Sequence, residues 1–180
     1  LFILLIGGVV FQTRNLGAYY TTPRPVEGGI FTEGILGTFT NANPIYAASS
    51  VDNSVEHLVF SGLFTFNEKN QLIGDLAQSW TVDERGTTYS VALKDTLKWH
   101  DGKPLTSADV VFTYNIIQNP DAKSPLASSW AGIKVAAVDD RTVTFTLPSI
   151  LTSFPYSMTN GIVPKHLLEG VPITQLRSIA

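Results

Sequence analysis

The stretch from Thr87 to Asn119 constrains the fold of this chain more than any other. Residues 87–93 alternate strictly, with Tyr89, Val91 and Leu93 on one face and small or hydroxylated residues on the other. A period of two is typical of a strand with one buried and one solvent-facing side. The segment therefore predicts a sheet that is covered by other elements on one face only.

A capped helix is expected soon after this strand. Thr106 and Asp109 have the spacing of a capping box, in which each side chain binds the other residue's main-chain N–H. The Asn119-Pro120 pair should end the helix, because the residue before a proline disfavours helical geometry. The predicted apolar face of this helix is made of Val110, Val111, Tyr114 and Ile117.

The remaining segments predict short strands and a few helices. Asn43-Pro44 is a typical helix start, and Gly62 is placed to close that helix in a left-handed conformation. Its expected apolar face is Val51, Val55, Leu58 and Val59. Strands are expected at 63–66, 79–82, 133–138 and 142–147, with short helices near 152–157 and after Pro164. The expected fold class is α+β.

The N-terminal segment differs from the rest of the chain. Residues 1–11 are all apolar or glycine, which suggests a truncated membrane anchor or the remainder of a signal segment. A small-residue cleavage pattern does not follow Phe11, which favours an uncleaved anchor; a buried core element is the third alternative. Residues 12–27 contain Pro23 and Pro25 and no regular period, and predict an extended linker that resists both helix and sheet.

Composition and charge argue against several classes of function. The 180 residues carry a formal net charge of -3 and no cysteine, which argues against nucleic-acid binding and excludes disulfides and thiol chemistry. The histidines, His57, His100 and His166, are isolated from one another and predict no metal site. No nucleophile elbow is present, and the carboxylates lie mostly in turns and caps. We therefore expect no catalysis and no cofactor.

From Val59 to Leu147 the sequence resembles the family 5 extracellular solute-binding proteins, whose members carry dipeptides, oligopeptides and, in some branches, nickel. The run Leu97 to Thr106, which reads LKWHDGKPLT, lies in the strongest matching stretch. Upstream, Gly28-Gly29 and Asn43-Pro44 also fit the family. The matching stretches, in order, are residues 60–64, 74–80, 89–113, 138–145 and 162–167.

The resemblance implies a bilobal periplasmic binding protein of type II, of which residues 28–180 form the N-terminal part and the second lobe is missing. Residues 28–43 would be the opening strand of the first lobe, 44–165 a subdomain, and 166–180 the return towards that lobe. The ligand would lie between two lobes that close by hinge motion. The ligand-binding residues that the resemblance implies are Thr38, Phe39, Thr40, Asn41, Trp130, Met158, Thr159 and Asn160. Trp130 is equally compatible with packing onto its own lobe.

The implied function is the capture of peptides or oligopeptides at the extracytoplasmic face of the membrane and their delivery to ABC permease subunits. The N-terminal segment departs from many relatives in having no lipidated cysteine, so a membrane anchor would have to replace it. Two alternatives are a carrier of nickel or another metal complex, and a ligand-sensing or surface interaction protein that reuses the fold.

Overall fold

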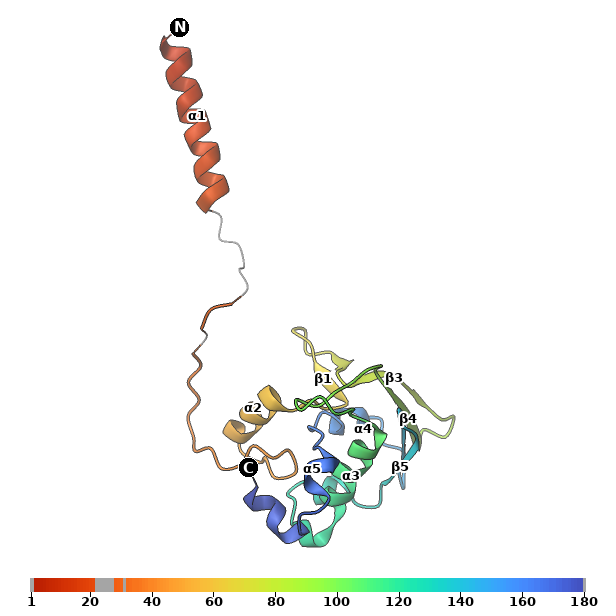
Figure 1. Ribbon diagram of the computed structural model, residues 1–180. Coiled ribbons are helices and arrows are strands. Elements are labelled where there is room, and N and C mark those ends of the chain that lie inside the picture. Colours follow the sequence, from red (N-terminus) through yellow and green to blue (C-terminus); the bar gives the residue numbers. More distant parts are fainter. Residues whose placement is uncertain (1, 22–27, 31, 180) are drawn as a thin grey trace. The chain divides into compact units, whose positions relative to one another are not determined.

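The computed structural model describes residues 2–21, 28–30 and 32–179, in two compact units, residues 1–34 and 35–180. In the first unit, α1 (Phe2–Thr21) is a single helix with exposed side chains along residues 2–16 (Figure 1). Among the described helices, none combines the length and the apolar character that crossing a membrane requires. The expectation of an extended linker at 12–27 is wrong for residues 12–21, which are helical; residues 22–27 lie outside the described part.

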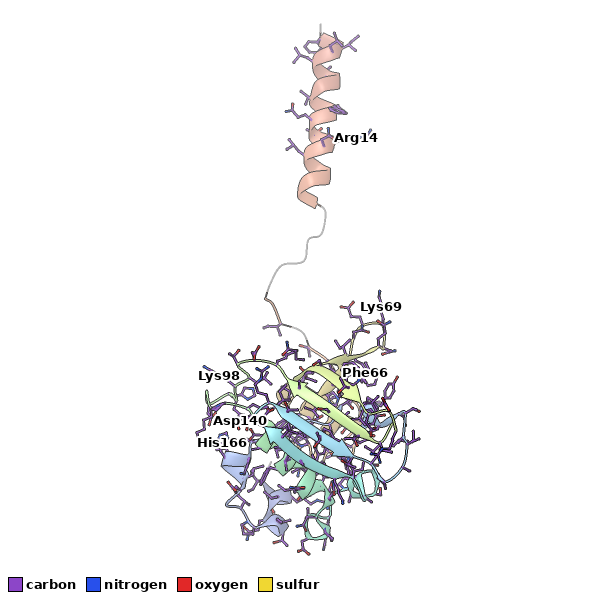
Figure 2. The ribbon with its side chains drawn as sticks, turned by 90° about the vertical axis from the view of Figure 1, so that its right-hand side faces the viewer. Arg14, Phe66, Lys69, Lys98, Asp140 and His166 are labelled. Atoms are coloured by element: carbon purple, nitrogen blue, oxygen red, sulfur yellow. The ribbon has the colours of Figure 1, made fainter. Side chains whose placement is uncertain are left out.

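The second unit is built on a four-stranded antiparallel sheet in the order β3-β4-β6-β5, which Figure 2 shows. The strands are β3 (Ala77–Val82), β4 (Thr88–Leu93), β5 (Lys134–Asp139) and β6 (Thr142–Thr146). The predicted alternation in β4 is confirmed, because Tyr89, Val91 and Leu93 are all buried. Val91 pairs with Val143 on β6, so buried residues of neighbouring strands lie side by side.

Helix α3 (Ser107–Gln118) packs against the sheet through contacts with β5 and β6 (Figure 1). The predicted capping box is confirmed, with the Thr106 N–H donating to Asp109 Oδ2 over 2.9 Å. The other oxygen, Oδ1, accepts from the main-chain N–H of Lys165 at 2.9 Å. Asp109 thus fixes both the start of α3 and the start of α5 (Lys165–Leu168).

Replacing Asp109 by alanine is expected to destabilise the protein by about 1–3 kcal/mol, because two main-chain donors lose their acceptor. The change is measured by urea denaturation followed by circular dichroism. Asp109→Asn keeps one oxygen acceptor and should cost less. Equal stability of the alanine variant and the wild type would contradict this role.

An aromatic cluster forms the centre of the core between α3 and the sheet. The rings of Tyr114 and Trp130 are stacked, with their centroids 3.9 Å apart. Phe145 on β6 and Phe154 on α4 (Phe154–Ser157) surround this pair, at 6.1 and 5.5 Å from the Trp130 ring. Tyr114 and Trp130 therefore pack against each other in the core, and Trp130 is only 1% exposed.

Shorter elements complete the unit. Strands β1 (Phe64–Phe66) and β2 (Leu72–Gly74) form a hairpin with Lys69 at its tip, as Figure 2 shows. The predicted strand at 63–66 and the polar turn after it are confirmed, whereas β2 is an additional strand. The other short elements are η1 (Pro120–Ala122), η2 (Ala127–Trp130) and η3 (Ile173–Ser178).

Three expectations for residues 28–62 differ from what the structure shows. Among residues 28–30 and 32–43 no strand is formed, so the opening strand is not present as a paired element. Helix α2 spans Ser50–Val59 and is capped by Ser49 rather than beginning at Asn43-Pro44. Asn43 instead accepts from the N–H of Ile45 at 3.1 Å and stabilises a turn. Gly62 does not close the helix; it forms an isolated bridge with Gly161.

Candidate functional site

A cavity of about 450 Å³ lies between helix α2, the segment 125–130 and the segment 156–160. Helix α2 contributes Asn53, Glu56 and His57 to its wall. The other contributors, besides Ala47 and Ala48, include apolar side chains and several amides and hydroxyls. They are Pro125, Leu126, Ser129, Trp130, Tyr156, Ser157, Thr159 and Asn160. This combination of an apolar wall with a few polar groups is typical of a small-molecule or peptide site.

The sequence-predicted site residues fall into two groups. Trp130, Thr159 and Asn160 come together at the cavity wall. Met158, next to Thr159 in the chain, is fully buried in the core and does not line the cavity. Its carbonyl oxygen accepts from the N–H of Phe64.

The second group, residues 38–41, does not line the cavity. Thr38, Phe39 and Thr40 are exposed, and Asn41 is buried with its side-chain amide donating to the carbonyl of Arg177 at 2.8 Å. Asp52 on α2 holds this segment, because its carboxylate accepts from the Thr40 N–H at 2.7 Å and from the Asn41 N–H at 3.1 Å. Helix α2 therefore holds Thr40 and Asn41 in place.

The buried face of α2 is rotated relative to the one expected from the sequence, in which only Val51 and Val55 are even half-buried. Leu58 and Val59 are 86% and 46% exposed, whereas Asp52 and Glu56 are buried. The reason is that main-chain N–H groups, not apolar side chains, meet this face of the helix. A buried carboxylate is tolerated when such donors satisfy it.

The two buried carboxylates have opposite electrostatic environments. Hydrogen bonds from the hydroxyl and N–H of Thr40 are the main cause that holds the pKa of Asp52 well below its usual range. Burial raises the pKa of Glu56 above its usual range, against the smaller lowering effects of His57 and of the Gly161 N–H. Asp52 therefore stays ionised while it holds residues 40 and 41. Glu56 binds a proton more readily than an ordinary glutamate does.

Glu56 is held from two sides at the edge of the cavity. Its Oε1 accepts from the Gly161 N–H at 2.9 Å, and its Oε2 lies 2.5 Å from His57 Nδ1. The same His57 nitrogen is 2.8 Å from the carbonyl oxygen of Asn53. Because two oxygen acceptors face it, Nδ1 carries a proton and donates to both.

Glu56→Gln should reveal the raised pKa as a pH trend in stability. A carboxyl group whose pKa is higher in the folded than in the unfolded chain contributes most at low pH and loses this contribution as the pH rises. The stability of the glutamine variant relative to the wild type should therefore increase from about pH 4 to pH 7. Urea denaturation at several pH values tests this expectation, and a relative stability that falls over this range would contradict it.

Glycines allow the close packing around Glu56. A Cβ atom on Gly161 would collide with Glu56 Oε1 and would lie 2.8 Å from the Phe60 Cβ. A Cβ on Gly62 would lie 2.5 Å from the main-chain oxygen of Thr159. The segment 159–161 can therefore approach α2 only because neither glycine carries a side chain.

Sequence reasoning missed Asn53, Glu56 and His57 as cavity residues. The available signal was the spacing of Asp52 and Glu56, which places two carboxylates on one helical face. Within the described residues, no group of three or more metal-ligating side chains lies close together. The site as described offers a concave surface, an amide-rich edge and one buried carboxylate.

The comparison with known protein families decides what kind of chain this is. Residues 71–171 match the family described as "Bacterial extracellular solute-binding proteins, family 5 Middle". The chain belongs to family 5 of the bacterial extracellular solute-binding proteins. The family 5 chain thus has the α+β architecture that the resemblance implied, and its matched relatives are binding proteins rather than enzymes.

Individual relatives agree with this assignment. The chain is 32% identical over 168 residues to the oligopeptide-binding protein AppA of Bacillus subtilis, covering 92% of this chain and 31% of AppA. The structure of AppA in complex with a nonapeptide matches with a TM-score of 0.71 at 32% identity, over 76% of this chain and 28% of that one. The structure of NikZ from Campylobacter jejuni in complex with Ni(L-His) matches with a TM-score of 0.70 at 33% identity, over 77% and 28%. The chain therefore spans less than a third of the length of the relatives it matches.

Proposed function

We propose that this chain forms part of the first lobe of an ABC importer's substrate-binding component, which captures peptides or oligopeptides outside the cytoplasmic membrane. Family membership supports a binding role, and the similarity to AppA supports peptides as the ligand class. Delivery to permease subunits is proposed on the same similarity.

The observation that carries the proposal is the cavity between α2 and the segment 156–160. It brings Trp130, Thr159 and Asn160 to one surface, and a second lobe closing over it would bury a ligand there. The exposed segment at Thr38 and Phe39 offers main-chain groups for an extended peptide, since main-chain hydrogen bonds tolerate varied side chains. We propose ligand contacts from Thr40 and Asn41 as well.

The test is a calorimetric titration with a mixed library of di- to pentapeptides. The protein used is full-length except that residues 1–26 are removed. Saturable heat and a raised melting temperature with peptides would establish the proposed function. Silence with every peptide would refute it.

Carriage of a metal complex is the second candidate, because NikZ matches this chain in structure and its own ligand is Ni(L-His). The same protein is therefore titrated with nickel and histidine. A response to the nickel–histidine mixture, together with silence towards peptides, would favour this second function. Silence with both would favour a sensing or surface interaction role.

We also propose that the N-terminal segment attaches the protein to the extracytoplasmic face of the membrane. Apolar side chains are exposed along residues 2–11 of α1, and such a surface gains free energy when it enters a lipid interface. The protein is expected to float with phosphatidylglycerol-containing vesicles. The double substitution Ile6→Asp and Val10→Asp should reduce binding by about tenfold or more. Wild-type protein that stays in the aqueous fraction would contradict this attachment.

A further inference from the structure

The cavity beside α2 contains one buried carboxylate, that of Glu56, whose side-chain partner among the described residues is the exposed His57. Among its lining residues, the ionisable groups near neutral pH are Glu56 and His57. Glu56 is 3% exposed, so its charge is poorly screened by water. The remaining wall supplies apolar surface, amides and hydroxyls. A ligand that enters this cavity therefore meets a site with a negative end.

The partners of Glu56 leave part of its binding capacity unused. An ionised carboxylate offers about four lone-pair directions, and in the described residues its contacts are the Gly161 N–H and His57 Nδ1. His57 has 60% of its side chain exposed and needs only one proton, on Nδ1, to make its contacts. No lysine or arginine from the described part of the chain is paired with Glu56.

We propose that Glu56 makes this cavity selective for ligands that carry a positively charged group, an amine or a guanidinium. The inference rests on the proposed peptide-binding function and names which peptides the site prefers. The neutral parts of the wall would contact the rest of the ligand side chain, and a cation would complete the hydrogen bonding of the carboxylate. The cationic group comes either from a lysine or arginine side chain or from the amino terminus of the peptide.

The test compares matched peptides on the full-length protein by calorimetry. One series varies a central residue among lysine, norleucine and glutamate, with the amino terminus acetylated; a second series has norleucine at the centre and a free or an acetylated amino terminus. The wild type should bind the cationic member of at least one series about tenfold to a hundredfold more tightly than its neutral match. The series that shows this preference identifies the source of the cation.

Glu56→Gln should abolish the preference, because glutamine removes the charge and keeps an oxygen acceptor for the Gly161 N–H. Asn53→Lys, on the exposed side of α2, places a cation near Glu56. It should also abolish the preference, because the lysine balances the charge of Glu56 instead of removing it. This second variant keeps the test decisive if Glu56→Gln does not fold. Glu169→Gln is the matched control, since Glu169 is an exposed glutamate that pairs with Lys165 outside the cavity.

The outcomes separate this inference from the proposed function. Equal affinity of the wild type for cationic and neutral peptides overturns the inference and leaves peptide binding intact. A preference that persists in Glu56→Gln, or that disappears in Glu169→Gln, also overturns the role of Glu56. Silence with all peptides refutes the proposed function. Lysinamide and agmatine are then titrated, and silence with both of them overturns the inference too.

Discussion

Replacing Trp130 by alanine is expected to destabilise the protein by about 3–5 kcal/mol, the cost of removing a large buried aromatic side chain. The Trp130 ring is stacked on Tyr114 and lies against Phe154 and Phe145, so its loss leaves a void in the centre of the core. The surrounding rings belong to helices and a strand that cannot collapse into such a volume without moving. Urea denaturation with circular dichroism measures the change.

Two further variants make this expectation specific. Trp80→Ala removes the same side chain from a position that is 42% exposed, where the ring has an edge-to-face contact with Phe64, and it should cost clearly less. Trp130→Phe keeps a ring against Tyr114 and should recover part of the lost stability. If Trp130→Ala and Trp80→Ala destabilise the protein equally, the aromatic cluster is not the centre of the core.

The elements that could be predicted from the sequence are those whose signals are local. Strand β4 follows from its own alternation, and α3 follows from a capping box whose members are three residues apart. Strands β5 and β6 form where the sequence predicts strands at 133–138 and 142–147, and they pair with each other. In each case the residues that determine the element also belong to it, so no distant partner is needed.

Helix α2 shows where local signals fail. Its start was misplaced because Asn43 resembles a helix cap, while its side chain in fact stabilises a turn. Its buried face is rotated relative to the apolar one because the partner of Glu56 is the N–H of Gly161, 105 positions away in the chain. Apolar periodicity cannot reveal a face that is covered by main-chain donors, and tertiary contacts override it here.

The candidate site was predictable in part for the same reason. The resemblance to a family located Trp130, Thr159 and Asn160 at the cavity wall. The same resemblance implies Met158 as a ligand-binding residue, but its side chain is buried in the core. Glu56 and His57 were missed because a carboxylate and an imidazole on a helix are more often solvent-exposed, and their place at a cavity depends on the segment 156–160.

Gly161→Ala is expected to destabilise the protein by about 1–3 kcal/mol, as overpacking of a closed site usually does. The added methyl group would overlap Glu56 Oε1 and would lie 2.8 Å from the Phe60 Cβ. The Glu56 carboxylate can rotate away only by losing its bond to the Gly161 N–H, and the Phe60 Cβ can give way only if the main chain at the end of α2 moves. The same displacement would shift the segment 159–161 at the cavity wall, so peptide affinity should fall together with stability.

Gly170→Ala is the matched control, because a Cβ atom there would meet no neighbour within 4 Å. Gly170 does not have a positive φ angle, so an alanine there introduces no backbone strain. This control should be neutral or slightly stabilising, since it reduces the conformational freedom of the unfolded chain. Thermal denaturation and peptide titration of both variants test the pair. If Gly161→Ala behaves like Gly170→Ala in both measurements, the close contact between α2 and Gly161 does not shape the cavity.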